Sequence, residues 1–325
     1  MNLVIYLVVS FVFTAILGKI FIPILKKMKV GQNERNDGPS FHFRKKGTPT
    51  MGGIMIMITV IISMFIFGFL NRDVMDIKPY IACALAAVGF GIIGFIDDYK
   101  KIVLKNTKGL SPTLKMIGLF VIAGGFTYYL LHYLNIGTDI IIPFTDISFT
   151  LPVWIYVLFT IFVMLATTNA VNLTDGVDGL AGSVTTIIFL AMAFISYKLN
   201  GEALSYLSVV FAGATFGFLI YNFYKAKVMM GDTGSLLLGG AISTIMITLK
   251  NPFLIVILAI IPVIEALSDI LQLIYTYKNK GKRLLKMAPL HHHLELSGWR
   301  ENKVVAVFSL VTLVGAALSI LSVMI

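Results

Sequence analysis

The dominant pattern along this chain is a series of long apolar runs separated by short polar segments. Uncharged runs of roughly 20 residues, long enough to cross a bilayer as helices, occur at about ten positions. They lie near residues 2–22, 51–70, 79–96, 114–134, 151–171, 179–197, 203–222, 235–249, 252–275 and 304–325. The pattern predicts an all-α integral membrane protein with about ten transmembrane helices, forming a single polytopic domain over residues 1–325.

Composition agrees with this class of protein. Of the 325 residues, 58% are hydrophobic and only 13% are charged, and the mean hydropathy is +0.90, which excludes an ordinary soluble domain. The single cysteine, Cys83, falls within the third apolar run, so no intrachain disulfide is expected. The opening MNLVIYLVVS lacks a basic region and a small-residue cleavage site, so we interpret it as a retained helix.

The positions of Lys and Arg predict the orientation in the membrane. Five alternate polar segments, at about 23–49, 97–115, 172–178, 222–234 and 276–303, carry 21 of the 26 basic residues. This bias predicts that these segments are cytoplasmic loops and that both termini are extracytoplasmic. The net charge of +10 is then mostly cytoplasmic charge, facing membrane lipid headgroups and soluble anions, and it gives no reason to expect a nucleic-acid partner.

A polar stretch, residues 169–182 (NAVNLTDGVDGLAG), interrupts two apolar runs. Asn169, Asn172, Asp175 and Asp178 recur every three residues, so they share one face if the preceding helix continues. The intervening glycines allow a ligand or another backbone to approach closely. The alternative is a polar turn whose Asn and Asp residues cap helices. Similar clusters recur on the predicted cytoplasmic side, and this recurrence favours a functional site.

Carboxylates mark two further clusters. Asp97 and Asp98 follow an apolar run in GFIDDYKK, where acids at a helix C-terminus oppose the helix dipole, so a partner cation (Lys100, Lys101 or a metal) is expected. The alternative is a solvated helix end. Asp232 precedes the eighth run in MGDTGS, where it could simply cap the helix, although the flanking glycines also suit a carboxylate beside a phosphate and a cation.

Two basic or imidazole-rich segments complete the pattern. The loop over 23–49 includes Lys45 and leads into GTPTMGG, where Thr50 and a helix start would suit an anion, although a plain positive-inside loop explains it as well. The run His291–His293 has only His42 as a further ligand on the same face, so phosphate hydrogen bonding is favoured over zinc. Glu265 and Asp269, in the ninth run, are expected to be functional or paired.

Together these clusters indicate phosphoryl transfer at a membrane face. Carboxylates without cysteines favour Mg²⁺ as a cofactor, and Lys and His would stabilise phosphate charge. The site's position implies one lipid substrate and one soluble substrate. A lipid or solute transporter is the alternative from another class, but transporter sites tend to lie near the bilayer midplane rather than at one face.

The segments GTPTMGG, GFIDDYKK, NAVNLTDGVDGLAG, MGDTGSLLLGG and APLHHHLELSGW resemble those of the bacterial phospho-N-acetylmuramoyl-pentapeptide transferases, within the superfamily of polyprenyl-phosphate N-acetylhexosamine-1-phosphate transferases. The resemblance spans about residues 31–303, and the triple-His segment distinguishes this family within the superfamily. One departure is VVAVFSL after Lys303, which lacks an expected Arg and Trp but lies beyond the last motif.

The resemblance implies a reaction in which UDP-N-acetylmuramoyl-pentapeptide and undecaprenyl phosphate give lipid I and UMP, with Mg²⁺, during peptidoglycan synthesis at the bacterial inner membrane. It also implies a homodimer. A related transferase that uses UDP-N-acetylglucosamine is the alternative within the same class. Direct attack by the lipid phosphate and a phospho-aspartyl intermediate both remain open.

The same resemblance implies roles for individual residues. Asp232 would bind Mg²⁺, with Asp98 as a second candidate ligand that assists metal or diphosphate placement. Asp97 would accept a proton from the lipid phosphate or orient it, and Lys115, His291 and the neighbouring His292 would bind phosphate. The residues expected to hold the nucleotide or build its pocket are Lys45, Thr50, Asn169, Asn172, Asp175, Asp178, His292 and His293.

Overall fold

The computed structural model describes residues 2–28, 47–102, 104, 109–145 and 147–325. Lys45, one of the residues expected to bind nucleotide, lies outside this described part of the chain, as does His42.

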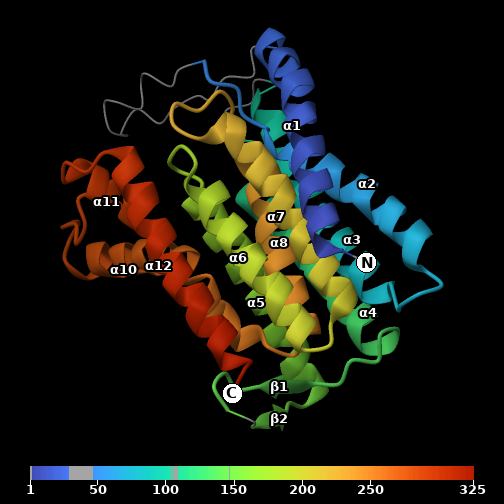
Figure 1. Cartoon of the computed structure of the whole chain (residues 1–325). Helices are drawn as coiled ribbons and strands as arrows, with labels where there is room; N and C mark the ends of the chain where they lie inside the picture. The colour runs from blue at the N-terminus through green and yellow to red at the C-terminus, as the bar shows by residue number, and fades with distance from the viewer. Residues whose placement is uncertain (1, 29–46, 103, 105–108, 146) are drawn as a thin grey trace.

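Long helices match the predicted apolar runs one for one within the described residues (Figure 1). They are α1 (Leu3–Lys27), α2 (Gly53–Asn71), α3 (Lys78–Ile102), α4 (Pro112–His132), α5 (Val153–Thr174), α6 (Leu180–Lys198), α7 (Glu202–Asn222), α8 (Gly231–Thr248), α10 (Ile260–Lys278) and α12 (Glu301–Ser322). Nine of these, all except α8, are long and apolar enough to cross a membrane. The expected all-α membrane class is therefore confirmed, whereas the orientation and the position of the termini stay predictions.

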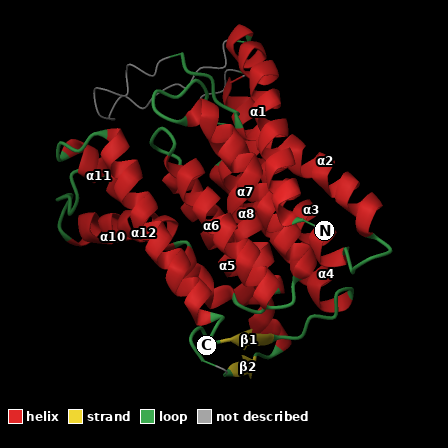
Figure 2. Cartoon of the chain, viewed as in Figure 1, coloured by secondary structure: helices red, strands yellow, loops and turns green. Residues whose placement is uncertain are grey.

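Helix α8 is the centre of the bundle. Every residue from Thr233 to Thr248 is buried, and α3 and α5 pack along it. The ribbon in Figure 2 shows α8 surrounded by helices rather than at the edge. Because α8 faces protein on all sides, it tolerates the polar and glycine residues of its first turn, which a lipid-facing helix would not.

Glycines bring the site-bearing ends of three helices into direct backbone contact. A Cβ added at Gly94 of α3 would come within 3.0 Å of the Asp232 carbonyl of α8, and one added at Gly53 of α2 would come equally close to the Gly234 backbone. Small residues at such crossings let helix backbones approach without a side chain between them. This close packing fixes where the carboxylates of α3 and α8 lie relative to each other.

The structure corrects two local expectations and adds detail to two others. Helix α3 continues to Ile102, so Asp97 and Asp98 lie in its C-terminal part, as expected of acids at a helix C-terminus. Asp232 lies in the first turn of α8, not before it. The ninth run is broken into η2 (Pro252–Leu254), α9 (Ile255–Leu258) and α10, because Pro252 cannot continue an earlier helix and the backbone at Ala259 leaves the helical region. Three histidines form part of a short helix, α11 (Leu290–Leu296).

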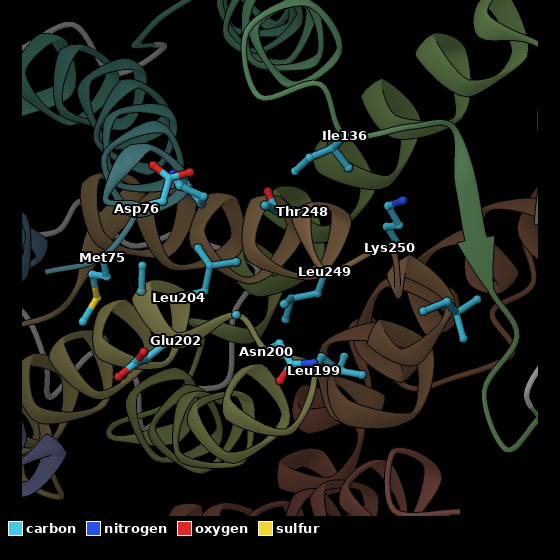
Figure 3. Close-up of a pocket in the computed structure, with 14 residues that line it drawn as sticks. Met75, Asp76, Ile136, Leu199, Asn200, Glu202, Leu204, Thr248, Leu249 and Lys250 are labelled. Carbon is cyan, nitrogen blue, oxygen red and sulfur yellow. The ribbon is translucent and has the colours of Figure 1, made fainter.

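The opposite end of the bundle carries a short hairpin between α4 and α5. Strands β1 (Asp139–Ile141) and β2 (Ser148–Thr150) pair antiparallel, and Asp139 forms an ion pair with Lys250 after α8. A cavity of about 550 Å³ opens at this end, lined by residues that include Asp76, Glu202 and Lys250 (Figure 3). It adjoins the start of α3 and the end of α8, whereas Asp97 and Asp232 lie at the other ends of these helices.

The glycine contacts generate a prediction about stability. Gly94→Ala should lower the free energy of unfolding by about 1–3 kcal/mol, the usual cost of overpacking a well-packed interior, because its methyl group meets the α8 backbone. The matched control is Gly124→Ala in α4, where an added Cβ has nothing within 4 Å. Thermal melting in detergent measures both variants, and equal melting temperatures would show that the α3–α8 contact can relax.

Candidate active site

Two carboxylates and two ammonium groups form the centre of the site. Lys101 Nζ lies 2.7 Å from Asp97 Oδ2 and 3.2 Å from Asp232 Oδ2. Lys115 Nζ, from the first turn of α4, lies 2.7 Å from Asp232 Oδ2 and 3.6 Å from Asp97 Oδ2. We call these four residues the charge square. The structure thus brings together three of the five predicted catalytic residues and adds Lys101, which was one of three candidate cations.

Asp98, the fourth predicted catalytic residue, caps helix α8 instead of joining the charge square. It is only 4% exposed. Its Oδ2 accepts hydrogen bonds from the Thr233 backbone N–H at 2.9 Å and the Thr233 hydroxyl at 2.7 Å, and its Oδ1 accepts from the Asp232 N–H at 3.3 Å. These are among the N–H groups that a helix leaves without an internal partner. The two adjacent carboxylates therefore have different partners, Asp98 the start of α8 and Asp97 the lysines.

Asparagine and aspartate from the end of α5 reach the first turn of α8. Asn172 donates from its side-chain amide to Asp232 Oδ1 at 2.9 Å and to the Ser235 hydroxyl at 2.8 Å. Asp175 Oδ2 accepts a hydrogen bond from the Gly231 N–H at 3.1 Å. Helix α5 ends at Thr174, so Asn172 lies in its last turn and Asp175 is the residue after it. The expected common helical face of four residues is therefore not formed, because Asp178 lies beyond the helix. Asn172 and Asp175 both fix the surroundings of Asp232.

The other predicted pocket residues in the described part of the chain differ in their relation to the charge square. Thr50 is buried, and its hydroxyl lies close enough to Gly231 that an added Cβ there would come within 3.0 Å of it. Asn169 instead donates to the Leu165 carbonyl of its own helix. Asp178 is buried and accepts from the Ala226 N–H at 2.9 Å, so it holds the segment that precedes α8. Asn169 and Asp178 make these contacts away from the charge square.

Two histidines of α11 pair with buried glutamates. His291 Nδ1 lies 2.7 Å from Glu265 Oε2 of α10, and both side chains are almost completely buried. His292 Nδ1 lies 3.0 Å from Glu295 Oε2, within the same short helix. His293 Nδ1 accepts from the backbone N–H of Lys286. In these hydrogen bonds the three histidines have different partners. His291 also lies against the turn that follows Asp175, where an added Cβ at Gly176 would come within 3.0 Å of its Nε2.

Sequence reasoning missed the full role of Lys101 and the contribution of Ser235. Lys101 lies four residues after Asp97, which is the spacing at which an acid and a base meet on a helix. That signal was present but did not separate Lys101 from Lys100. Nothing in the sequence shows which helix lies beside Ser235, so its contact with Asn172 depends on the tertiary packing.

The carboxylate oxygens of the charge square are donors of the kind that bind a divalent cation. Two carboxylate oxygens, one each from Asp97 and Asp232, already share a single ammonium group, which shows that they converge on one cationic position. Within the described ranges, no three His, Cys, Asp or Glu side chains gather as a metal cage. Mg²⁺ typically binds one or two carboxylates and completes its shell with water and substrate phosphates, so this donor set suits it.

Comparison with known proteins places the chain in a class. The family model described as Glycosyl transferase family 4 matches residues 80–250, more than half of the chain, and this range contains the whole charge square. The match therefore defines the class as a membrane-embedded glycosyl transferase of family 4.

Curated relatives define the family more closely. A phospho-N-acetylmuramoyl-pentapeptide-transferase of Clostridium botulinum (strain Alaska E43 / Type E3) is 47% identical over 95% of this chain and 92% of its own length. That of Clostridium perfringens (strain 13 / Type A) is 46% identical over 96% of both chains. That of Clostridium kluyveri (strain NBRC 12016) is 47% identical over 99% of both. The chain belongs to the phospho-N-acetylmuramoyl-pentapeptide-transferase family.

The capping role of Asp98 generates a prediction. Asp98→Asn should lower the free energy of unfolding by about 1–3 kcal/mol, because the NH2 group that replaces one carboxylate oxygen cannot accept, so one α8 donor is left buried without a partner. Chemical or thermal unfolding in detergent measures the effect. Asp139→Asn, which removes a partly exposed ion pair, is the control and should cost about 1 kcal/mol or less. A melting curve of Asp98→Asn that matches the unmodified protein would reject the capping role.

Proposed function

We propose that this protein transfers the phospho-N-acetylmuramoyl-pentapeptide group from its UDP derivative to undecaprenyl phosphate, releasing UMP and forming lipid I for peptidoglycan synthesis. The observation that carries the proposal is the charge square at one end of an apolar helix bundle. A site at that position can receive a soluble nucleotide and the headgroup of a lipid together. The names of the curated relatives supply the identity of the transferred group.

The residues of the charge square divide the work of phosphoryl transfer. An oxygen of the lipid phosphate attacks the phosphorus that bears the sugar, and the bond from that phosphorus to the UMP phosphate oxygen breaks. Lys101 and Lys115 stabilise the negative charge on the phosphate oxygens. Asp97 orients the lipid phosphate or takes its proton through Oδ2, because its Oδ1 is fixed by the Leu110 N–H at 2.7 Å.

Mg²⁺, when bound, would neutralise charge on the diphosphate and help to align it. Asp232 would be its main protein ligand, and Asn172 fixes the Asp232 side chain by donating to Oδ1. Lys101, which is 39% exposed, has room to leave Asp232 and contact a phosphate instead. Asp98 as a second ligand would have to give up its hydrogen bonds to α8.

The setting of the reaction follows from the charge distribution and the family. We place the protein in the bacterial inner membrane with the charge square toward the cytoplasm, where the basic segments are expected. Membrane lipid then surrounds the bundle and supplies undecaprenyl phosphate from the same bilayer. A homodimer is also proposed, and the mass of the purified protein in detergent, by light scattering, tests it.

The direct test is UMP release by the purified protein in detergent. We expect release that requires both undecaprenyl phosphate and UDP-N-acetylmuramoyl-pentapeptide, and that stops when Mg²⁺ is removed by a chelator and resumes when it is restored. Release with UDP-N-acetylglucosamine instead would overturn the substrate assignment but keep the chemistry. Absence of release with either nucleotide would reject the transferase and favour a transporter, because detergent leaves no two compartments to separate.

Asp232 is the residue on which the metal assignment depends most. Asp232→Asn should reduce UMP release by about 10²–10³-fold, because it removes the charge at the oxygen shared by both lysines. The protein should remain folded, since the amide keeps the shape of the side chain. Asp139→Asn, at the far end of the bundle, is the carboxylate control and should retain full turnover. Substantial Mg²⁺-dependent release by Asp232→Asn would reject Asp232 as the principal ligand.

A further inference from the structure

A buried carboxylate outside the charge square is paired with His291, whose ring lies against Gly176 in the turn that follows α5. Glu265 of α10 has no exposed surface, and its two oxygens both serve His291. Oε1 accepts from the His291 backbone N–H at 3.1 Å, and Oε2 lies 2.7 Å from His291 Nδ1. Next to it, the Ser268 hydroxyl accepts from the Leu290 N–H at 3.0 Å. Helix α10 therefore holds both the backbone and the ring of His291.

This pairing decides which nitrogen of the ring is directed at the site. A carboxylate can only accept hydrogen bonds, so Nδ1 must carry a proton to meet Glu265, whether the ring is neutral or charged. Nε2 is left as the second nitrogen. Among the buried side-chain nitrogens and oxygens of the described residues, it is one of the few without a hydrogen-bond partner. Buried polar atoms are normally paired, so an unpaired one that faces a site indicates a ligand still to come.

The surroundings of Nε2 connect it to the charge square. Gly176 lies against it, and any side chain there would collide with the ring. Gly176 follows Asp175, whose carboxylate accepts from the Gly231 N–H beside Asp232. The turn from Asp175 to Gly179 thus lies between the histidine and the first turn of α8.

We infer that Glu265 is a positioning residue, which holds the proton on His291 Nδ1 and thereby commits Nε2 to the substrate phosphate that docks beside the Asp175–Gly179 turn. The inference rests on the proposed function for the identity of that ligand. Glu265 does not touch the substrate; it acts through His291. The neighbouring pair of His292 and Glu295 has the same chemistry but lies within one helix, so it provides an internal comparison.

The ring proton can be observed without any reaction. The chain has five histidines, so ¹⁵N-histidine labelling gives few signals, and His291→Gln identifies those of His291. In the unmodified protein we expect His291 Nδ1 to show the shift and the coupling of a protonated nitrogen. Glu265→Gln should abolish that signature, because its carbonyl must accept from the His291 backbone and its amide then donates to Nδ1. Glu295→Gln should leave the His291 signals unchanged. An unprotonated Nδ1 in the unmodified protein would overturn the inference.

The turnover number provides a second test of the inference. Glu265→Gln should lower the turnover number by about 10–100-fold, the range known for carboxylates that orient metal-bound histidines, with its melting temperature near that of the unmodified protein. Asp139→Asn, at the far end of the bundle, is the carboxylate control and should retain its rate, since Asp139 pairs with Lys250 and not with a histidine of α11. A Glu265→Gln protein that loses the Nδ1 proton and keeps its rate would overturn the positioning role.

A second variant keeps the inference testable if Glu265→Gln does not fold. Gly176→Ala removes no carboxylate but places a methyl group against Nε2. It should retain the protonated Nδ1 signal and lose turnover by at least about 10-fold, in the range given above. Unchanged turnover would show that this face of the ring is not used. If the unmodified protein releases no UMP at all, the proposed function fails with the catalytic role, whereas the ¹⁵N signals still report the pairing itself.

Discussion

The site depends first on one buried carboxylate and the helix end that it caps. Asp98 receives the N–H groups of Asp232 and Thr233, and in doing so it joins the last turns of α3 to the first turn of α8. Helix α8 could not begin there with its donors unpaired inside the bundle, because each would cost about 1–3 kcal/mol. The glycine contacts then bring the two backbones together. Asp98 and Asp232 are 134 positions apart along the chain. Their contact is what brings Asp97, the neighbour of Asp98, to the same lysines as Asp232.

The rest of the site is assembled from the ends of elements. Helix ends supply groups whose hydrogen bonds are not used inside the helix, and they can therefore be turned to neighbours or to a ligand. Lys115 comes from the start of α4, Asn172 from the end of α5 and His291 from the start of α11. The apolar middles of the helices set the distances between these ends. The site is thus built from helix ends, each of which, taken alone, would be an ordinary helix terminus.

Much of this arrangement could be predicted from the sequence, and the reasons differ by element. Hydropathy located the long helices because a helix that faces lipid needs about 20 apolar residues. Hydropathy also located α8, although α8 faces protein and not lipid, because a helix buried inside a bundle needs apolar residues as well. The acid clusters were found because charge beside an apolar run is costly. Sequence could not assign Asp98 to a cap and Asp97 to the lysines, because that division depends on which helix packs against α3. Glu265 drew attention as a charge in an apolar helix, but its partner lies 26 residues away.

The charge square has a consequence for how substrates enter. Its two carboxylates and two lysines neutralise one another, so the resting site resembles an ion exchanger with its counter-ions already in place. A phosphate group that enters must take lysine contacts from the two carboxylates, and the negative charge that it brings needs a further cation, which is the role proposed for Mg²⁺. The electrostatic cost of assembling the site is met during folding. Binding accordingly depends on how readily two flexible ammonium groups change partners, and less on the overall charge of the surface.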